Sequence, residues 1–156
     1  MTQEDKELLL RDLCARLPYG VKVCIDDDTQ EPEVLYEIST FKPNPHFSTQ
    51  SWLRVYIENI KPFLRSFKSM TKDERSEYYK RCKSYHYKRT WKYCRSEYGE
   101  TLYRKEPRSY TAFYRTPEAL DYLNSIHVDY RGLIKKGLAL KAERGMYDNT
   151  ENEANR

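Results

Sequence analysis

The stretch VKVCIDDDTQEPEVLYEI, residues 21–38, decides the fold of this chain. Apolar and polar residues alternate in its two halves, so residues 21–25 and residues 34–38 are each typical of a half-buried β-strand. Between them lies an acidic loop, from Asp26 to Pro32, that is rich in turn-forming residues. The pattern therefore predicts an antiparallel hairpin with a seven-residue loop.

The segments on either side of this hairpin predict both helix and strand. Thr2 and Asp5 form a near match to a capping box, and leucines then recur at helical spacing as far as Leu17, which predicts an amphipathic helix. Residues 52–57 are expected to form a third strand, and residues 110–114 alternate in the same way. We predict a single α+β domain over residues 1–145, with a small antiparallel sheet of three or four strands and an N-terminal helix.

The composition indicates a folded domain with an unusual core. Of the 156 residues only 30 are Leu, Ile, Val or Phe, whereas 15 are Tyr, so tyrosine rings are expected to fill part of the core. No run of about 18 apolar residues occurs, which excludes a transmembrane helix. The acidic start is unlike the basic start of a secretory signal. The expected location is the cytoplasm, with no membrane partner.

Positive charge and tyrosine are concentrated in one part of the chain. Residues 75–115 contain 12 Lys or Arg and 4 Glu, a net charge of +8, while the remaining 16 basic and 20 acidic residues give −4. The same segment contains 9 of the 15 tyrosines, together with Trp91. Basic and aromatic residues interleaved in this way are typical of an interaction surface.

This basic segment is expected to form one long helix. Thr71 and Glu74 form a capping box, and no Gly or Pro follows until Gly99. On such a helix four cations would form a stripe with aromatic rings on both sides. The predicted binding residues are the cations Arg81, Lys88, Lys92 and Arg95 and the aromatic residues Tyr85, Trp91 and Tyr98.

This predicted surface favours a non-enzymatic binding function. Tyr, Trp and Arg are enriched among the residues that dominate protein interfaces, so the leading interpretation is binding to an acidic protein surface or a ribonucleoprotein complex. The alternative is direct binding of RNA or single-stranded DNA, with the cations on phosphates and the rings stacked on bases. A solvated helix face that covers the core is the simplest explanation, and a homo-oligomer is a further option.

Catalytic and metal-binding patterns are weak in this sequence. It contains no Gly-rich phosphate loop, no nucleophile elbow and no zinc-protease motif, so we expect neither an enzyme nor a cofactor. The four cysteines lack CxxC spacing. Cys82 and His86 would share a helix face, but two ligands do not make a zinc site, and no metal is predicted. His127 and Asp129 could act as an acid–base pair only if the fold holds them close to a substrate.

The C-terminal third is expected to be a helical module that ends in a tail. Thr116 and Pro117 mark the start of a short helix that runs through Ile126. Asp129 is expected to cap a last short helix that ends at Gly137. From Met146 onward the chain is polar, and residues 146–156 are predicted to be a mobile tail.

Three segments carry a resemblance to a known family: MTQEDKELLLRDLCARLPYGV (residues 1–21), residues 60–71, and DYRGLI with GLAL (residues 129–140). They resemble a family of small uncharacterised proteins of gut Bacteroidetes and their prophage-like mobile elements. The resemblance implies an intracellular setting and brings no catalytic or ligand-binding residue. It also implies that residues 75–115 are a variable elaboration on a shared frame. In that setting the expected role is an accessory protein or an inhibitor of a host defence complex.

Overall fold

Two β-sheets and three α-helices make up the part of the chain that the computed structural model describes, which is residues 1–25, 31–39, 45–51, 54–88 and 109–147. The α+β class predicted from the sequence is confirmed. The helices are α1 (Gln3–Arg16), α2 (Lys72–Arg81) and α3 (Pro117–Ser125), with short 3-10 turns η1 (Leu17–Tyr19), η2 (Ile57–Asn59) and η3 (Phe67–Ser69). The strands are β1 (Lys22–Cys24), β2 (Glu33–Ser39), β3 (His46–Thr49), β4 (Arg54–Tyr56), β5 (Lys61–Leu64), β6 (Lys83–Lys88), β7 (Ser109–Tyr114) and β8 (Leu140–Lys141).

The first helix and the first hairpin form as predicted. The Thr2 hydroxyl accepts a hydrogen bond from the backbone N–H of Asp5, and the Asp5 side chain accepts one from the backbone of Thr2, which completes the capping box of α1. β1 and β2 pair antiparallel, with Lys22 opposite Val34. Of the loop between them, residues 26–30 lie outside the described residues.

The main sheet is larger than the predicted three or four antiparallel strands. It has six strands in the order β4-β3-β2-β1-β5-β8, and its last pair, β5 and β8, is parallel. The count was wrong because β3 and β5 lie in proline-containing segments that predict breaks: Pro45 directly precedes β3 and Pro62 lies within β5. β8 has only two residues, too few for a recognisable alternation.

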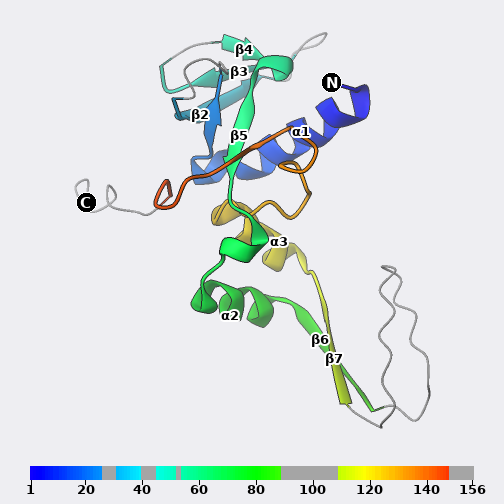
Figure 1. Ribbon diagram of the computed structural model, residues 1–156. Coiled ribbons are helices and arrows are strands. Elements are labelled where there is room, and N and C mark those ends of the chain that lie inside the picture. Colours follow the sequence, from blue (N-terminus) through cyan, green and yellow to red (C-terminus); the bar gives the residue numbers. More distant parts are fainter. Residues whose placement is uncertain (26–30, 40–44, 52–53, 89–108, 148–156) are drawn as a thin grey trace.

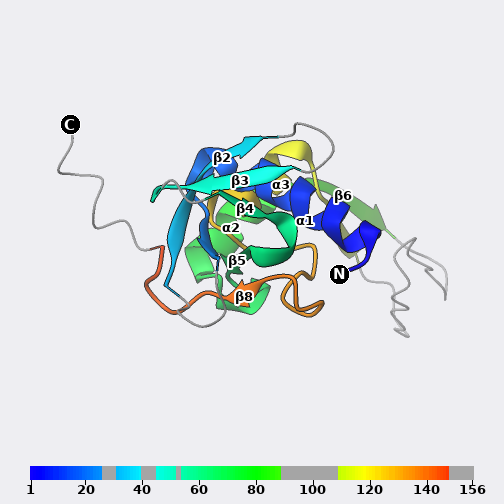
Figure 2. The ribbon, with the colours of Figure 1, turned by 90° about the horizontal axis from the view of Figure 1, so that it is seen from above.

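The main core lies between α1 and the six-stranded sheet. Leu9 and Leu13 of α1 are fully buried, and they belong to one cluster with residues of β1, β2, β3 and β5. Figures 1 and 2 show α1 running alongside this sheet. The helical spacing of leucines and the alternation of the strands therefore meet in one core, as the sequence pattern requires.

A second, smaller core lies between α2 and α3. It contains Met70, Tyr78 and Cys82 from the region of α2, together with Ala119 and Leu123 of α3. Tyr78 is 5% exposed and makes an edge-to-face contact with Phe67, with ring centroids 5.6 Å apart. Figure 1 shows this helical part below the main sheet, joined to it by the chain that follows β5.

A buried ion cluster connects the two cores. Arg16 and Asp12 are both fully buried in α1, with Arg16 Nε 2.7 Å from Asp12 Oδ2. The same guanidinium donates a 2.9 Å hydrogen bond to the carbonyl of Val128, in the second core. Arg131 Nε lies 3.1 Å from the other Asp12 oxygen. One carboxylate thus holds two arginines from different parts of the chain.

Tyr147 also connects distant elements, although the sequence places it in the predicted tail. Its hydroxyl accepts a 3.0 Å hydrogen bond from the Lys22 N–H of β1 and donates a 2.7 Å bond to the Phe63 carbonyl of β5. Its ring stacks on His127, with centroids 3.9 Å apart. The predicted tail therefore begins no earlier than residue 148, and residues 148–156 lie outside the described residues.

The C-terminal module is helical only in its first part. α3 begins as predicted, with Thr116 as its N-cap and Pro117 in its first turn. The short helix expected after Asp129 is absent from the described residues. Instead the two carboxylate oxygens of Asp129 accept hydrogen bonds from the backbone N–H groups of Leu133 and Ile134, each 2.9 Å long, and they hold a series of turns that leads to β8.

No helix within the described ranges has both the length and the apolar character that a membrane crossing requires.

Candidate functional site

The predicted basic segment begins with a well-fixed helix. The Thr71 hydroxyl accepts a 3.1 Å hydrogen bond from the Glu74 N–H, and the Glu74 carboxylate accepts one from the Thr71 N–H, as the capping box predicts. Arg65 holds the same carboxylate with two contacts of 2.7 and 2.9 Å. These contacts, the Arg65 hydrogen bond foremost, lower the pKa of Glu74. The start of α2 is thereby anchored to the chain that follows β5.

The predicted long helix is wrong, because α2 ends at Arg81. Cys82 has extended backbone angles, φ −75° and ψ 146°, and β6 follows directly. The sequence of β6, KSYHYK, alternates polar and aromatic residues, and aromatic residues favour strands. The stripe of cations expected on one helix face is therefore not formed between Arg81 and Lys88.

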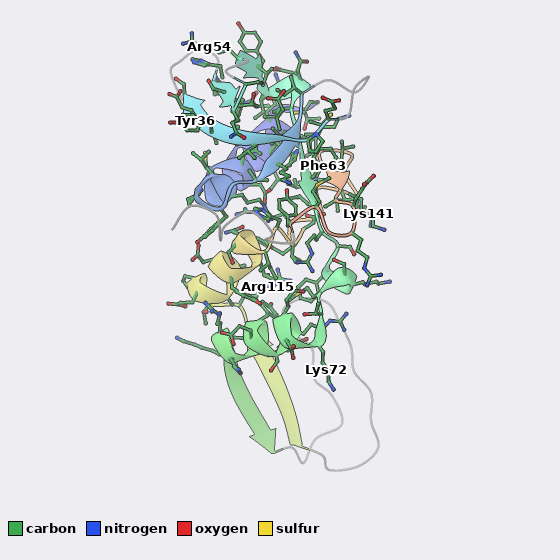
Figure 3. The ribbon with its side chains drawn as sticks, turned by 90° about the vertical axis from the view of Figure 1, so that its left-hand side faces the viewer. Tyr36, Arg54, Phe63, Lys72, Arg115 and Lys141 are labelled. Carbon is green, nitrogen blue, oxygen red and sulfur yellow. The ribbon has the colours of Figure 1, made fainter. Side chains whose placement is uncertain are left out.

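β6 and β7 form a separate two-stranded antiparallel sheet, which we call the arm (Lys83–Lys88 and Ser109–Tyr114). Its register runs over six residue pairs, from Lys83 opposite Tyr114 to Lys88 opposite Ser109. The strand expected over residues 110–114 is confirmed as β7. Figures 1 and 3 show the arm extending away from α2 and α3, on the side opposite to the main sheet. The rest of the described chain is called the body.

Thr116 holds the two ends of the arm together. Its hydroxyl donates a 2.7 Å hydrogen bond to the carbonyl of Arg81, the last residue of α2. The same oxygen accepts a 3.1 Å bond from the Ala119 N–H and so caps α3. Because α2 leads into β6 and β7 leads into α3, this one side chain fixes the point at which the arm leaves the body.

Tyr78 and Arg115 add to this base. The Tyr78 hydroxyl lies near Cys82 and near Arg115, the exposed residue that follows β7. Burial is the main cause of the raised pKa of Tyr78; the nearby Cys82 raises this pKa further, whereas Arg115 lowers it. The Arg115 guanidinium also lies 6.0 Å from the ring centroid of Tyr130. Figure 3 shows Arg115 beside the base of the arm.

The predicted site residues fall in three different places. Arg81 is the last residue of α2, where its guanidinium contacts Glu77 at 3.0 Å and lies 4.7 Å from the Tyr122 ring centroid. The hydrogen bonds from Lys80 and Arg81 lower the pKa of Glu77. Tyr85 and Lys88 are in β6. The remaining four, Trp91, Lys92, Arg95 and Tyr98, lie outside the described residues.

Sequence reasoning did not assign the residues that position the arm. Thr116 was recognised only as a helix cap, because its second hydrogen bond joins residues 35 positions apart and leaves no local pattern. The end of α2 did leave a signal, the alternation in KSYHYK. This alternation was not used, because the end of the helix was predicted only from the next Gly or Pro in the sequence.

The residues considered for metal binding and acid–base chemistry are placed as follows. Cys82 follows α2 and His86 is in β6, so they do not share a helix face. In the described ranges, His, Cys, Asp and Glu form no group of three able to hold a metal ion. His127 is 3% exposed with a left-handed φ of 55°, and burial, aided by Arg16, lowers its pKa to about 3. The Asp129 carboxylate binds backbone N–H groups instead of His127.

Comparison with known proteins finds no matching family model, no matching curated protein and no matching solved structure.

Proposed function

We propose that the protein is a non-enzymatic binding protein whose arm captures an acidic surface of another protein. The observation that carries this proposal is the arm itself, a strand pair that extends from the body (Figure 1) in the segment where the chain concentrates its positive charge and tyrosine. Lys83, at the start of β6, is exposed. Opposite charges on two surfaces speed their encounter and set their orientation.

The way the arm is attached supports this function. Thr116, Tyr78 and Arg115 fix its base, while both cores lie in the body. A partner can thus bind the arm without disturbing the packing on which the fold depends. The tyrosines of this segment are well suited to an interface, since a rigid amphipathic ring gives much contact area for little lost conformational freedom.

The setting follows from the family resemblance and is part of the same proposal. A small protein of a mobile element in the cytoplasm of its host would meet host complexes, and binding without chemistry would inhibit them by occupancy. We therefore propose an acidic protein or ribonucleoprotein complex of the host, such as a defence complex, as the partner.

A charge-reversal experiment tests the proposal. The double variant Lys83→Glu, Lys88→Glu, at the two ends of β6, should lose more than tenfold in affinity for a partner that is isolated from the native host with nuclease present and then purified. The matched control reverses two exposed lysines of the body, Lys68→Glu and Lys141→Glu, and should retain full affinity. Equal affinity of the two variants would remove the arm from consideration.

Direct nucleic-acid binding is the second candidate, and the correction from helix to strands gives it a specific basis. A two-stranded β-ribbon fits the major groove of duplex DNA. Such binding would weaken linearly in a plot of log affinity against log salt, with a slope set by the number of phosphate contacts. Loss of the captured partner after nuclease treatment would favour this candidate over a protein partner.

A further inference from the structure

The two sheets in the described part of the chain differ in the length of their edge strands. The main sheet ends at β4, with three residues, and at β8, with two. Short edge strands are a common means of preventing unwanted pairing with other chains. Both strands of the arm have six residues, and they pair without interruption over their whole length. The long edges are therefore on the arm.

The backbone of the arm offers hydrogen-bonding groups on these edges. Each strand of a ladder uses only alternate N–H and C=O groups for its neighbour, and the others point outward. In the described part of the chain, β6 and β7 pair with each other and with no other strand. A two-stranded sheet alone is marginally stable in water, and a third strand is the usual way to stabilise it. The outward groups of the arm are thus a template for an added strand.

The charge of the two strands selects one edge and one kind of occupant. β6 begins and ends with lysine, at Lys83 and Lys88, whereas β7 contains no charged residue. An added strand with acidic residues would have opposite charges beside it on β6. A second copy of the arm is disfavoured, because residues 75–115 carry a net charge of +8 in each copy.

We propose that the outer edge of β6 binds its partner by β-strand addition and takes up an extended acidic segment of that protein as a third strand. This inference rests on the proposed function, and it specifies the part of the partner that binds and the backbone groups that hold it. Main-chain hydrogen bonds of β6 hold the segment in place, and the lysines at both ends of the strand favour acidic side chains.

Three synthetic peptides of eight residues test this proposal on the full chain. The first alternates Glu and Val, and the second alternates Lys and Val. The third has the Glu–Val sequence with a methyl group on every backbone nitrogen, which keeps the charge but removes the N–H donors on both sides of the strand. We expect the Glu–Val peptide to bind at least tenfold more tightly than either of the others in fluorescence anisotropy. It should also slow amide hydrogen exchange at every second residue of β6. Equal binding of the N-methylated peptide, or unchanged exchange in β6, would overturn the proposal.

Proline substitutions on the arm give the matched variants. His86 and Tyr87 are neighbours in β6, so one of the variants His86→Pro and Tyr87→Pro removes an N–H that points outward and the other removes one that bonds to β7. The outward variant is the one in which amide exchange of β7 stays slow, because the β6–β7 ladder is kept. This variant should lose at least tenfold in affinity for the Glu–Val peptide. In β7, the outward variant of the pair Thr111→Pro and Ala112→Pro should retain its affinity for that peptide. The reverse result would assign the added strand to β7 and contradict the proposal.

The outcomes also separate this inference from the proposed function. Charge reversal of the arm can abolish binding of a purified partner while that partner leaves amide exchange in β6 of the unchanged chain as it was. In that case the arm binds proteins and strand addition is wrong. If the chain alone forms a dimer in light scattering and dimer formation protects β6, the occupant is a second copy and the acidic segment is wrong. We expect the partner to slow amide exchange in β6, and we expect an acidic peptide to displace the segment of the partner that does so.

Discussion

The six-stranded sheet and the arm are both antiparallel in most of their pairings, yet they are supported in different ways. The strands of the main sheet pack on α1, Tyr147 ties that sheet to the C-terminal segment, and the Asp12 cluster ties α1 to distant parts of the chain. The arm is held by its own ladder and by contacts at its base. The sheet therefore depends on tertiary contacts, whereas the arm depends on local pairing, so changes in the arm should leave the body folded.

The largest effect is expected where the body is most dependent on tertiary contacts. Asp12→Asn leaves the buried Arg16 without its countercharge and weakens the hold on Arg131. Removing one partner of a buried ion pair costs about 3–5 kcal/mol, so the free energy of unfolding should fall by that amount in urea titration. The control Glu77→Gln removes two exposed ion pairs, with Lys80 and Arg81, and should change stability by less than about 1 kcal/mol. If Asp12→Asn lowered the free energy of unfolding by less than about 1 kcal/mol as well, the Asp12 cluster would not stabilise the body.

A smaller effect is expected from pH, again in the body. The His127 pKa is lowered to about 3 in the folded protein, while an unfolded histidine has a pKa of about 6.5. Between these values the unfolded chain binds a proton that the folded protein does not, so stability rises with pH in this window. Lowering the pH from 7 to 5 should reduce the free energy of unfolding by about 2 kcal/mol.

Carboxylates with lowered pKa values, such as Glu74, lose their contribution only at lower pH, so the range from 7 to 5 isolates the histidine. In the variant His127→Asn, whose side chain tolerates the left-handed φ, this dependence should be nearly flat. An unchanged slope in the variant would assign the pH dependence to other groups.

The smallest effect is expected at the junction of arm and body. Thr116→Val removes the cap of α3 and the hydrogen bond to the Arg81 carbonyl, at a cost of about 1 kcal/mol for the cap. Amide exchange in β6 and β7 should become faster as the base loosens. Thr71→Val removes a cap of the same type from α2, away from the arm, and should cost a similar amount without changing exchange in the arm. Equal exchange in the two variants would contradict the role of Thr116.

The features that the sequence predicts correctly are those with a local cause. The first hairpin and the starts of all three α-helices depend on alternation within a few residues or on a capping side chain three positions away. β5 was missed because Pro62 lacks an N–H and so argues against an inner strand. In the structure it lies opposite Val23, near the point where Tyr147 replaces a strand-to-strand contact.

The sequence predicted correctly where along the chain the candidate site begins, but its predicted secondary structure, one long helix, was wrong. Charge and tyrosine content located residues 75–115, because composition does not depend on secondary structure. The form was missed because a helix and a strand compete closely in KSYHYK, and pairing with β7, more than twenty positions away, decides between them. The hydrogen bond from Thr116 to Arg81 is likewise a tertiary contact.

The hydroxyl of Tyr147 has a consequence for the order in which the protein folds. It bonds to Lys22, which lies 125 positions before Tyr147 in the sequence, and to Phe63, which lies 84 positions before it. Contacts of such long range form late, because closing a long loop costs chain entropy before any contact compensates for it. The β1–β2 hairpin and α1 can form early, but the bridge between β1 and β5 through Tyr147 forms only when the C-terminal segment docks. We therefore expect that docking step to limit the rate of refolding.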